Sequence, residues 1–199
     1  MRILVVGASG TIGRAIVAAF QPQHEVIAAS RLSLDAPVDI EKPASIREMF
    51  RRTGKVDAVV SAAGQAKYAP LANLTDADFK YSLENKLVGN INLVRLGFEW
   101  VNDGGSFTLT SGVYAQTPQP GSAAYSTVNA GLEGFTRSAA LEAPRGIRVN
   151  IVSPPWVAET MAAMGLDPSP GLPAATLARA YVGSVTGKQT GVVITPERG

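Results

Sequence analysis

The first residues of the chain place a continuous apolar run directly before a glycine-rich turn. Residues 2–6 read RILVV and are followed at once by GASGTIG at 7–13. A strand that is apolar at consecutive positions is typical of one buried on both faces, as in a parallel sheet. A helix is predicted over residues 12–20, immediately after the glycines. The chain is therefore expected to open with a βα unit, which restricts it to folds built on a parallel sheet.

The same alternation continues to the end of the chain. Further strands are predicted at residues 25–29, 57–61, 106–110, 147–152 and 191–195, with helices near 45, over 75–101, over 122–143 and over 174–185. Ser45-x-x-Glu48 and Thr75-x-x-Asp78 have the spacing of capping boxes that begin helices. The pattern predicts an α/β fold of Rossmann type, a doubly wound parallel sheet of about seven strands flanked by helices. No repeat or linker divides it, so residues 1–199 are predicted to form a single domain.

Composition excludes several kinds of site and partner. The 199 residues include no cysteine and one histidine, and the net charge is +2. Disulfides, thiolate chemistry and a metal centre are therefore not expected, and no basic block points to nucleic acid. No apolar run reaches the ~20 residues that span a bilayer. Because the first strand begins at Arg2, no room is left for a signal peptide, and a cytoplasmic protein without a membrane partner is expected.

The glycine turn is suited to a nucleotide. Glycines permit a tight turn and a close approach of the backbone to a pyrophosphate, and the following helix start offers free N–H groups and a positive dipole end. At the end of the second predicted strand, Ser30 and Arg31 stand near where an acidic residue would hold the ribose of NAD. Arginine favours the 2′-phosphate of NADP instead. NADP(H) is the preferred prediction, and Asp35 leaves NAD open as the less favoured alternative.

Several motifs together resemble the short-chain dehydrogenase/reductase family over nearly the whole chain. Residues 61–64, SAAG, resemble its Asn-Asn-Ala-Gly motif, and Asp39 matches its adenine-binding aspartate. Ser111 follows the fourth predicted strand, and Tyr125 lies 14 residues later. The segments EGFTR at 133–137 and RGIRVNIVSP at 145–154 are the most specific match.

The resemblance implies a mechanism and a cofactor site. Tyr125 would protonate the substrate carbonyl oxygen as hydride arrives, and Ser111 would hydrogen-bond the same oxygen. Pro154 begins a Pro-Pro pair where the family has Pro-Gly, and Val157 and Thr160 match positions that contact the nicotinamide. The predicted cofactor-binding residues are Gly7, Ser9, Gly10, Thr11, Ile12, Gly13, Ser30, Arg31, Asp39, Ala62, Ala63, Gly64, Pro154, Val157 and Thr160.

Two departures from the family pattern affect the catalytic residues. The family's lysine four residues after the tyrosine is Asn129 here, and its asparagine on the preceding long helix is Lys86. Each position thus shows the residue expected at the other. We therefore hypothesise that the lysine and asparagine have exchanged helices and that Lys86 supplies the charge to Tyr125. The alternative is that Lys86 is a surface lysine.

Two functions remain open from the sequence. The first is an oxidoreductase that transfers hydride between NADP(H) and a small carbonyl/alcohol substrate. The second is a catalytically impaired dinucleotide-binding redox sensor or scaffold, which the missing motif lysine favours. The segment 159–173 offers few residues for a lid, and its Ala, Gly, Met and Pro content hints at a small or apolar substrate. A homodimer or homotetramer through helices 75–101 and 122–143 is expected, since Leu87, Ile91, Leu93, Val94, Phe98 and Trp100 exceed one buried face.

Overall fold

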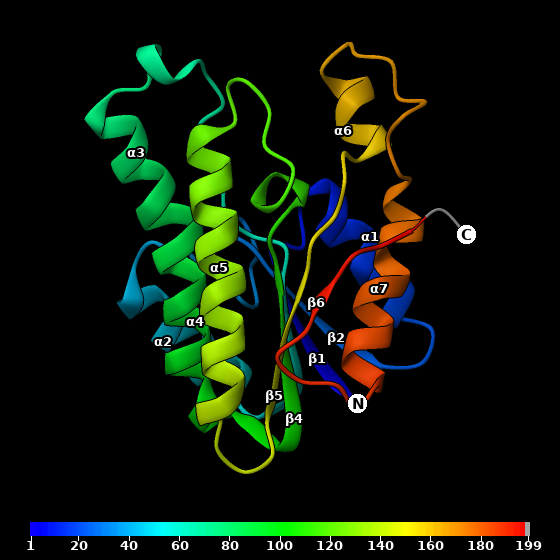
Figure 1. The fold of residues 1–199 in the computed structure, drawn as a ribbon. Coiled ribbons are helices and arrows are strands. Elements are labelled where there is room, and N and C mark those ends of the chain that lie inside the picture. Colours follow the sequence, from blue (N-terminus) through cyan, green and yellow to red (C-terminus); the bar gives the residue numbers. More distant parts are fainter. Residues whose placement is uncertain (198–199) are drawn as a thin grey trace.

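The computed structural model describes residues 1–197, and its centre is one parallel sheet (Figure 1). Within these residues the sheet has six strands in the order β2-β1-β3-β4-β5-β6. The strands are β1 (Arg2–Val6), β2 (Glu25–Ala29), β3 (Val56–Ser61), β4 (Val101–Thr110), β5 (Arg148–Val152) and β6 (Val193–Ile194). The predicted Rossmann-type parallel sheet is confirmed, and the last two residues of the predicted domain lie outside the described range.

The predicted number of about seven strands is wrong. A further strand beside β2 would have to come from the segment that follows it. There, Ser30 and Pro37 form only an isolated bridge, and Val38 donates its N–H to the Ser30 carbonyl at 3.0 Å. The proline has no N–H to continue a ladder, so this segment forms no strand and β2 remains the edge of the sheet.

Helices cover both faces of the sheet, as Figure 1 shows. On one face α1 (Thr11–Phe20) packs beside α7 (Ala174–Thr186). The other face carries α2 (Pro43–Thr53), α4 (Gly89–Gly97) and α5 (Ala123–Glu142). The short elements are η1 (Leu71–Asn73), α3 (Asp76–Ser82), η2 (Leu83–Val88), η3 (Phe98–Trp100), η4 (Val113–Ala115) and α6 (Ala158–Ala163). Among the described residues, none of these helices is both long and apolar enough to cross a membrane.

Strand β1 explains why the sheet is covered on both faces. Leu4 and Val6 belong to the core cluster on the α2–α4–α5 side, whereas Ile3 and Val5 belong to the cluster on the α1–α7 side. All four are fully buried. Because successive strand residues point to opposite faces, a consecutive apolar run contributes to two cores at once.

Only one of the two predicted capping boxes forms. Thr75 accepts a hydrogen bond from the Asp78 N–H, and the Asp78 carboxylate accepts one from the Thr75 N–H, which starts α3 as predicted. The box at Ser45 is wrong, because α2 begins earlier, with Pro43 in its first turn and Lys42 as N-cap. The Ser45 hydroxyl instead accepts the Asp39 N–H at 2.9 Å.

The predicted long helix over 75–101 is interrupted. Between α3 and α4 the chain forms a π-helical segment, η2, in which the Gly89 N–H bonds to the Glu84 carbonyl. A π-turn has one residue more than an α-turn and alters which side chains face inward, and such turns are frequent at functional sites. Here the adjacent residues Asn85 and Lys86 are both buried, at 8% and 7% exposure.

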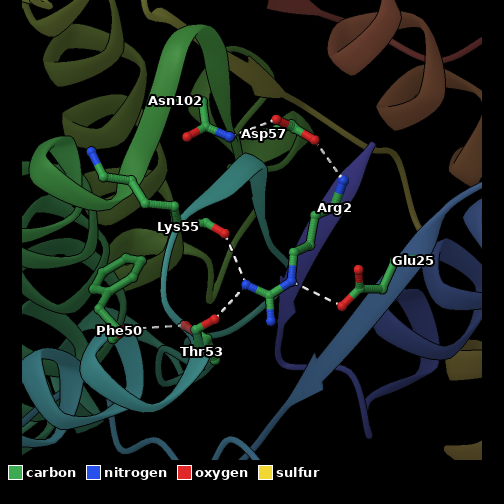
Figure 2. A network of polar contacts seen from close by, with 7 residues as sticks. All are labelled: Arg2, Glu25, Phe50, Thr53, Lys55, Asp57 and Asn102. Atoms are coloured by element: carbon green, nitrogen blue, oxygen red, sulfur yellow. Dashed lines mark hydrogen bonds and ion pairs between the residues drawn. The ribbon is translucent and has the colours of Figure 1, made fainter.

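The amino end of the sheet is fastened by one arginine and one aspartate (Figure 2). The Arg2 guanidinium donates to the carbonyls of Thr53 and Lys55 and pairs with Glu25 at 2.9 Å. Asp57 accepts the Arg2 backbone N–H at 2.7 Å and the Asn102 amide at 2.7 Å. These contacts join the starts of four neighbouring strands, β2, β1, β3 and β4.

The strand order reverses next to β1, and this reversal shapes the opposite, carboxyl end of the sheet. The chain moves from β1 to β2 on one side and then crosses to β3 on the other side of β1. In open α/β sheets such a switch point leaves a crevice outside the carboxyl ends of the strands. The glycine turn that follows β1 and the SAAG segment that follows β3 meet at this crevice.

Candidate active site

The crevice at the switch point contains a cavity of about 210 Å³. It lies outside the carboxyl ends of β1, β2 and β3. The structure brings most of the predicted nucleotide residues to its walls: Gly7, Ser9, Gly10, Ser30, Arg31, Asp39, Ala62, Ala63 and Gly64. Gln65 and Asn85 also line it and were not predicted. Thr11, Ile12 and Gly13 do not line the cavity; they form the first turn of α1 beside it.

The glycines at this crevice are required by close backbone packing. Gly7 has φ +83°, and a Cβ there would lie 2.8 Å from the Ala62 carbonyl carbon. A Cβ on Gly13 would lie 2.0 Å from the Gly7 carbonyl oxygen, so Gly13 lets α1 start against the turn. Gly10 caps α1 without a side-chain hydrogen bond. The first-turn N–H groups of α1 therefore remain available to an anion.

Arg31 and Asp39 bring charges of opposite sign to the cavity. Arg31 is exposed, and no ion pair or hydrogen bond of its side chain is found among the described residues. Asp39 pairs with Lys42 at 3.2 Å and accepts the Glu41 N–H at 3.2 Å. Asp35 is exposed and does not line the cavity. The unpaired charge at the end of β2 is therefore positive.

A second cavity, of about 640 Å³, lies beside the first at the carboxyl ends of β4 and β5. All four predicted catalytic residues line it, namely Ser111, Tyr125, Lys86 and Asn129. The predicted nicotinamide-contacting residues Pro154, Val157 and Thr160 line it as well. Helices η2 and α5 and the loops after β4 and β5 thus converge on one space.

Lys86 points into this second cavity rather than into solvent. Its ammonium donates to the Ser111 carbonyl oxygen at 3.1 Å and lies 5.5 Å from the centroid of the Tyr125 ring. Burial lowers the pKa of Lys86 to about 8. Its stem packs against Gly64, where a Cβ would come within 2.9 Å of the Lys86 Cα. The alternative that Lys86 is a surface lysine is therefore wrong.

The π-turn beside Lys86 is held by a buried asparagine. The Asn90 amide donates to the Lys86 carbonyl at 2.7 Å and to the Ala63 carbonyl at 3.2 Å. Its oxygen accepts the Ser61 hydroxyl at 2.6 Å. One side chain therefore links β3, the loop after it and η2. The neighbouring Asn85 faces the nucleotide cavity, where its oxygen accepts the Gln65 N–H at 2.6 Å.

Tyr125 and Ser111 face the same cavity through different contacts. Burial raises the pKa of Tyr125, and an N–H from Ala66 that bonds to its hydroxyl partly offsets this. The Ser111 hydroxyl donates to the Glu133 carboxylate at 3.0 Å. Among the described residues, no hydrogen bond joins the hydroxyls of Ser111 and Tyr125. The Asn129 oxygen is buried without a hydrogen-bond partner in the part of the chain that is described.

Two features of this cavity were missed from the sequence. Glu133 is 4% exposed and holds Ser111, and its position eight residues after Tyr125 on one helix face was a signal that could have revealed it. The other feature is an aromatic wall of Tyr68, Tyr114 and Trp156. Tyr68 and Trp156 lie on two loops and Tyr114 lies in η4, so no local spacing in the sequence indicates that they meet.

Comparison with known proteins agrees with this fold. Residues 7–193 match the family described as Enoyl-(Acyl carrier protein) reductase. Hydroxynaphthalene reductase arp2 of Aspergillus fumigatus is 31% identical over 78% of this chain and 56% of its own length, so the chain spans just over half of that relative. Carbonyl reductase family member 4 of Xenopus tropicalis is 30% identical over 78% of this chain and 67% of its own length.

Solved structures match over nearly the full length. The protein lin1944 from Listeria innocua is 43% identical, covers 98% of both chains and has a TM-score of 0.93. A small-chain dehydrogenase solved in complex with NADPH is 25% identical, covers 99% of this chain and 96% of its own, and has a TM-score of 0.87. The family match over residues 7–193, on a fold with the same switch-point crevice, establishes that this chain belongs to the short-chain dehydrogenase/reductase family.

Proposed function

We propose that the chain is an oxidoreductase that transfers hydride between NADP(H) and a small carbonyl/alcohol substrate. The observation that carries the proposal is the convergence of Ser111, Tyr125 and a buried Lys86 on a cavity that adjoins the nucleotide crevice. Relatives named as reductases support the same reaction class.

The crevice fits a dinucleotide phosphate. The glycine turn leaves a backbone cradle that a Cβ would fill, and α1 presents uncapped N–H groups to it. Arg31 and Ser30 would bind the 2′-phosphate, and Asp39 would bind the adenine. The unpartnered Asn129 oxygen offers an acceptor for a ribose hydroxyl. NADP(H) is favoured over NAD(H) because Arg31 lines the cavity and Asp35 does not. The NADPH complex of a related dehydrogenase supports this choice.

When bound, NADPH supplies the hydride that reaches the substrate carbonyl carbon. Tyr125 gives its phenolic proton to the carbonyl oxygen. Lys86, protonated below about pH 8, stabilises the resulting tyrosinate from beside the ring. The Ser111 hydroxyl has one proton and donates it to Glu133. To hydrogen-bond the substrate oxygen, the hydroxyl must therefore rotate away from Glu133. Lys86 thereby takes the charge role of the motif lysine that Asn129 replaces.

The second candidate is a dinucleotide-binding sensor or scaffold without turnover. The observation that favours it is the neutral Asn129 at the motif position. The buried ammonium of Lys86 weighs against it, since a cation in this apolar cavity is costly and would be retained for chemistry. Both candidates bind NADPH, but only the oxidoreductase consumes it.

Two measurements test the proposal. Fluorescence titration should give tight binding of NADPH and weaker binding of NADH, and Arg31→Ala should weaken NADPH binding roughly 10- to 100-fold while leaving NADH unchanged. Arg47→Ala, on the exposed face of α2, is the matched control.

Oxidation of NADPH by a panel of ketones should be abolished by Tyr125→Phe and retained by Tyr81→Phe. NADPH binding without turnover on any carbonyl compound would favour the sensor.

We also propose that the chain pairs with a second copy through α4 and α5. Of the six apolar residues expected at this surface, Leu93 and Val94 are fully buried in the core. The remaining support lies on α5, where Leu141 is 89% exposed and Gly134 has open space in front of it. Light scattering should show Gly134→Arg at half the wild-type mass or less. Gly183→Arg on α7, equally open, should leave the mass unchanged.

A further inference from the structure

The cavity beside Tyr125 has an aromatic wall of Tyr68, Tyr114 and Trp156. Tyr68 and Tyr114 have ring centroids 6.1 Å apart, and Tyr114 meets Trp156 edge-to-face at 6.2 Å. Tyr68 also contacts Tyr125 at 6.4 Å. The wall therefore begins at the tyrosine that would protonate the substrate and continues across the space where the rest of that substrate would lie.

The polar tips of this wall are already used within the protein. Tyr68 donates its hydroxyl to the Pro120 carbonyl at 2.9 Å, and Trp156 donates its indole N–H to the Tyr114 hydroxyl at 2.6 Å. Tyr114 in turn donates to the Gln119 side chain at 3.4 Å. What remains for a ligand is ring surface, which binds flat and apolar groups through stacking and edge contacts.

Flexible apolar side chains also line the cavity. Met161 from α6 and Met164 and Leu166 just after it line the same space. Met164 is 60% exposed and Leu166 is 47% exposed, so these large apolar groups have little protein cover. Methionine adapts to irregular shapes and its sulfur contacts aromatic rings favourably. The short segment after β5 therefore contributes three apolar side chains to the cavity.

The charges around the cavity disfavour an anionic group in the part of it that lies away from Lys86. Lys86 is the only charged residue among those that line it, and its ammonium lies at the reacting end, where it donates to the Ser111 carbonyl. No arginine or second lysine lines the cavity to meet a carboxylate or a phosphate. A charged group that lost its hydration there would have no compensating partner.

We infer that the substrate is a neutral, flat aromatic ketone, with its carbonyl at Tyr125 and its ring system between the aromatic wall and Met161–Leu166. This inference rests on the proposed function and narrows its substrate class. The ketone carbon gains hydride from NADPH as the carbonyl π bond opens, and the oxygen gains the Tyr125 proton to give a secondary alcohol. Acyl thioesters of coenzyme A or of an acidic carrier protein should be poorer substrates, since the residues that line this cavity offer their phosphates no cation besides Lys86.

The test compares 1-tetralone with its ring-carboxylated analogue and with acetoacetyl-CoA. NADPH oxidation should have a kcat/KM at least ~10-fold higher for 1-tetralone than for either anionic compound. In parallel, 1-tetralone should quench the fluorescence of Trp156 in the protein saturated with NADP⁺, and Trp156→Leu should remove the quenching. Trp100, stacked on Phe50 at 6.4 Å and outside the cavity, keeps its emission as an internal reference. Trp156→Leu should also raise the KM for 1-tetralone about 3- to 10-fold.

A charge placed at the mouth provides the matched variant. Met164→Lys should improve binding of the carboxylated tetralone by roughly 2- to 5-fold, because it supplies the missing cation at an exposed position. Leu34→Lys, at 92% exposure and outside both cavities, should change nothing. Turnover of acetoacetyl-CoA without binding of 1-tetralone would overturn the inference and leave the oxidoreductase standing. Binding of 1-tetralone with no turnover of any compound would support the aromatic binding site alone, and would overturn both the oxidoreductase and the assignment of the ketone as its substrate.

Discussion

In the proposed mechanism the chemistry of the second cavity depends on Lys86, because this residue places a cation beside Tyr125 where the motif lysine is missing. We predict that Lys86→Met lowers kcat/KM roughly 10²- to 10³-fold in ketone reduction, since the tyrosinate loses its stabilising charge. The wild-type rate should fall as the pH rises through about 8, where Lys86 loses its proton. Steady-state pH profiles measure both effects.

The matched control for this substitution is Lys67→Met. Lys67 also lies over a tyrosine ring, that of Tyr81 at 5.4 Å, but it is exposed and lines neither cavity. Its replacement should leave the rate and the alkaline limb unchanged. A Lys86→Met variant that kept the wild-type rate would remove the lysine from the mechanism and return the charge question to Asn129.

The same lysine should lower the free energy of unfolding, because its ammonium is buried. Burial lowers the pKa of Lys86 from 10.5 to about 8, so the unfolded chain binds its proton more tightly than the folded protein does. This penalty is complete below about pH 8 and fades as the pH approaches 10.5, where neither state holds the proton. Lys86→Met should therefore raise the free energy of unfolding by about 3 kcal/mol at pH 7.

Urea denaturation of both proteins at pH 7 and pH 9.5 measures this difference. The gain from Lys86→Met should be smaller at the higher pH. A variant that is less stable than wild type at pH 7 would mean that the hydrogen bond to the Ser111 carbonyl outweighs the desolvation of the ammonium.

At the scale of the element, the π-turn of η2 explains why neighbouring residues serve different cavities. Asn90 satisfies the Lys86 and Ala63 carbonyls and the Ser61 hydroxyl, and it is 1% exposed. We predict that Asn90→Ala lowers the free energy of unfolding by about 3 kcal/mol, because buried polar groups lose their partner. It should also lower turnover, since the π-turn that orients Lys86 loses the hydrogen bond that Asn90 donates to the Lys86 carbonyl.

Asn92→Ala is the control for that element. Asn92 accepts the Arg95 guanidinium at 2.7 Å three residues along α4 and does not bridge to another element. It should cost about 1 kcal/mol or less and leave turnover intact. Urea denaturation and NADPH oxidation on the same preparations separate the two cases. Equal losses of stability and turnover in both variants would show that Asn90 does not hold the π-turn in particular.

The elements also show how far sequence reasoning reaches. The strand pattern and the Thr75 box were predictable because each depends on residues close together in the chain. The inward direction of Lys86 followed only from a hypothesis about exchanged residues, because a π-turn leaves no mark in apolar periodicity. The box at Ser45 failed because Pro43 fixes an earlier helix start. The wall of Tyr68, Tyr114 and Trp156 depends on two loops and η4 meeting in space, which no local spacing encodes.

At the scale of the whole molecule, the two ends of the sheet divide stability from chemistry. The carboxyl ends of the strands surround both cavities, whereas the amino ends are joined by the Arg2–Asp57 network (Figure 2). Hydrogen bonds from the Arg2 N–H and from Asn102 lower the pKa of Asp57 below its ordinary 3.8. A carboxylate with a depressed pKa stabilises the fold above its unfolded pKa, and that stabilisation is lost as the pH falls through the folded value.

Asp57→Asn should therefore lower the free energy of unfolding by about 1–2 kcal/mol at pH 7. The difference from wild type should begin to shrink as the pH falls below the ordinary value of 3.8, because the unfolded chain then takes up the proton, and it should vanish only once the pH has passed the lower folded pKa. Asp103→Asn, which removes the exposed pair with Arg145 at the same end of the sheet, should cost ~0.5 kcal/mol or less. Affinity for NADPH should be unchanged in both variants. If Asp57→Asn weakened cofactor binding while the protein stayed folded, the two ends of the sheet would be coupled rather than independent.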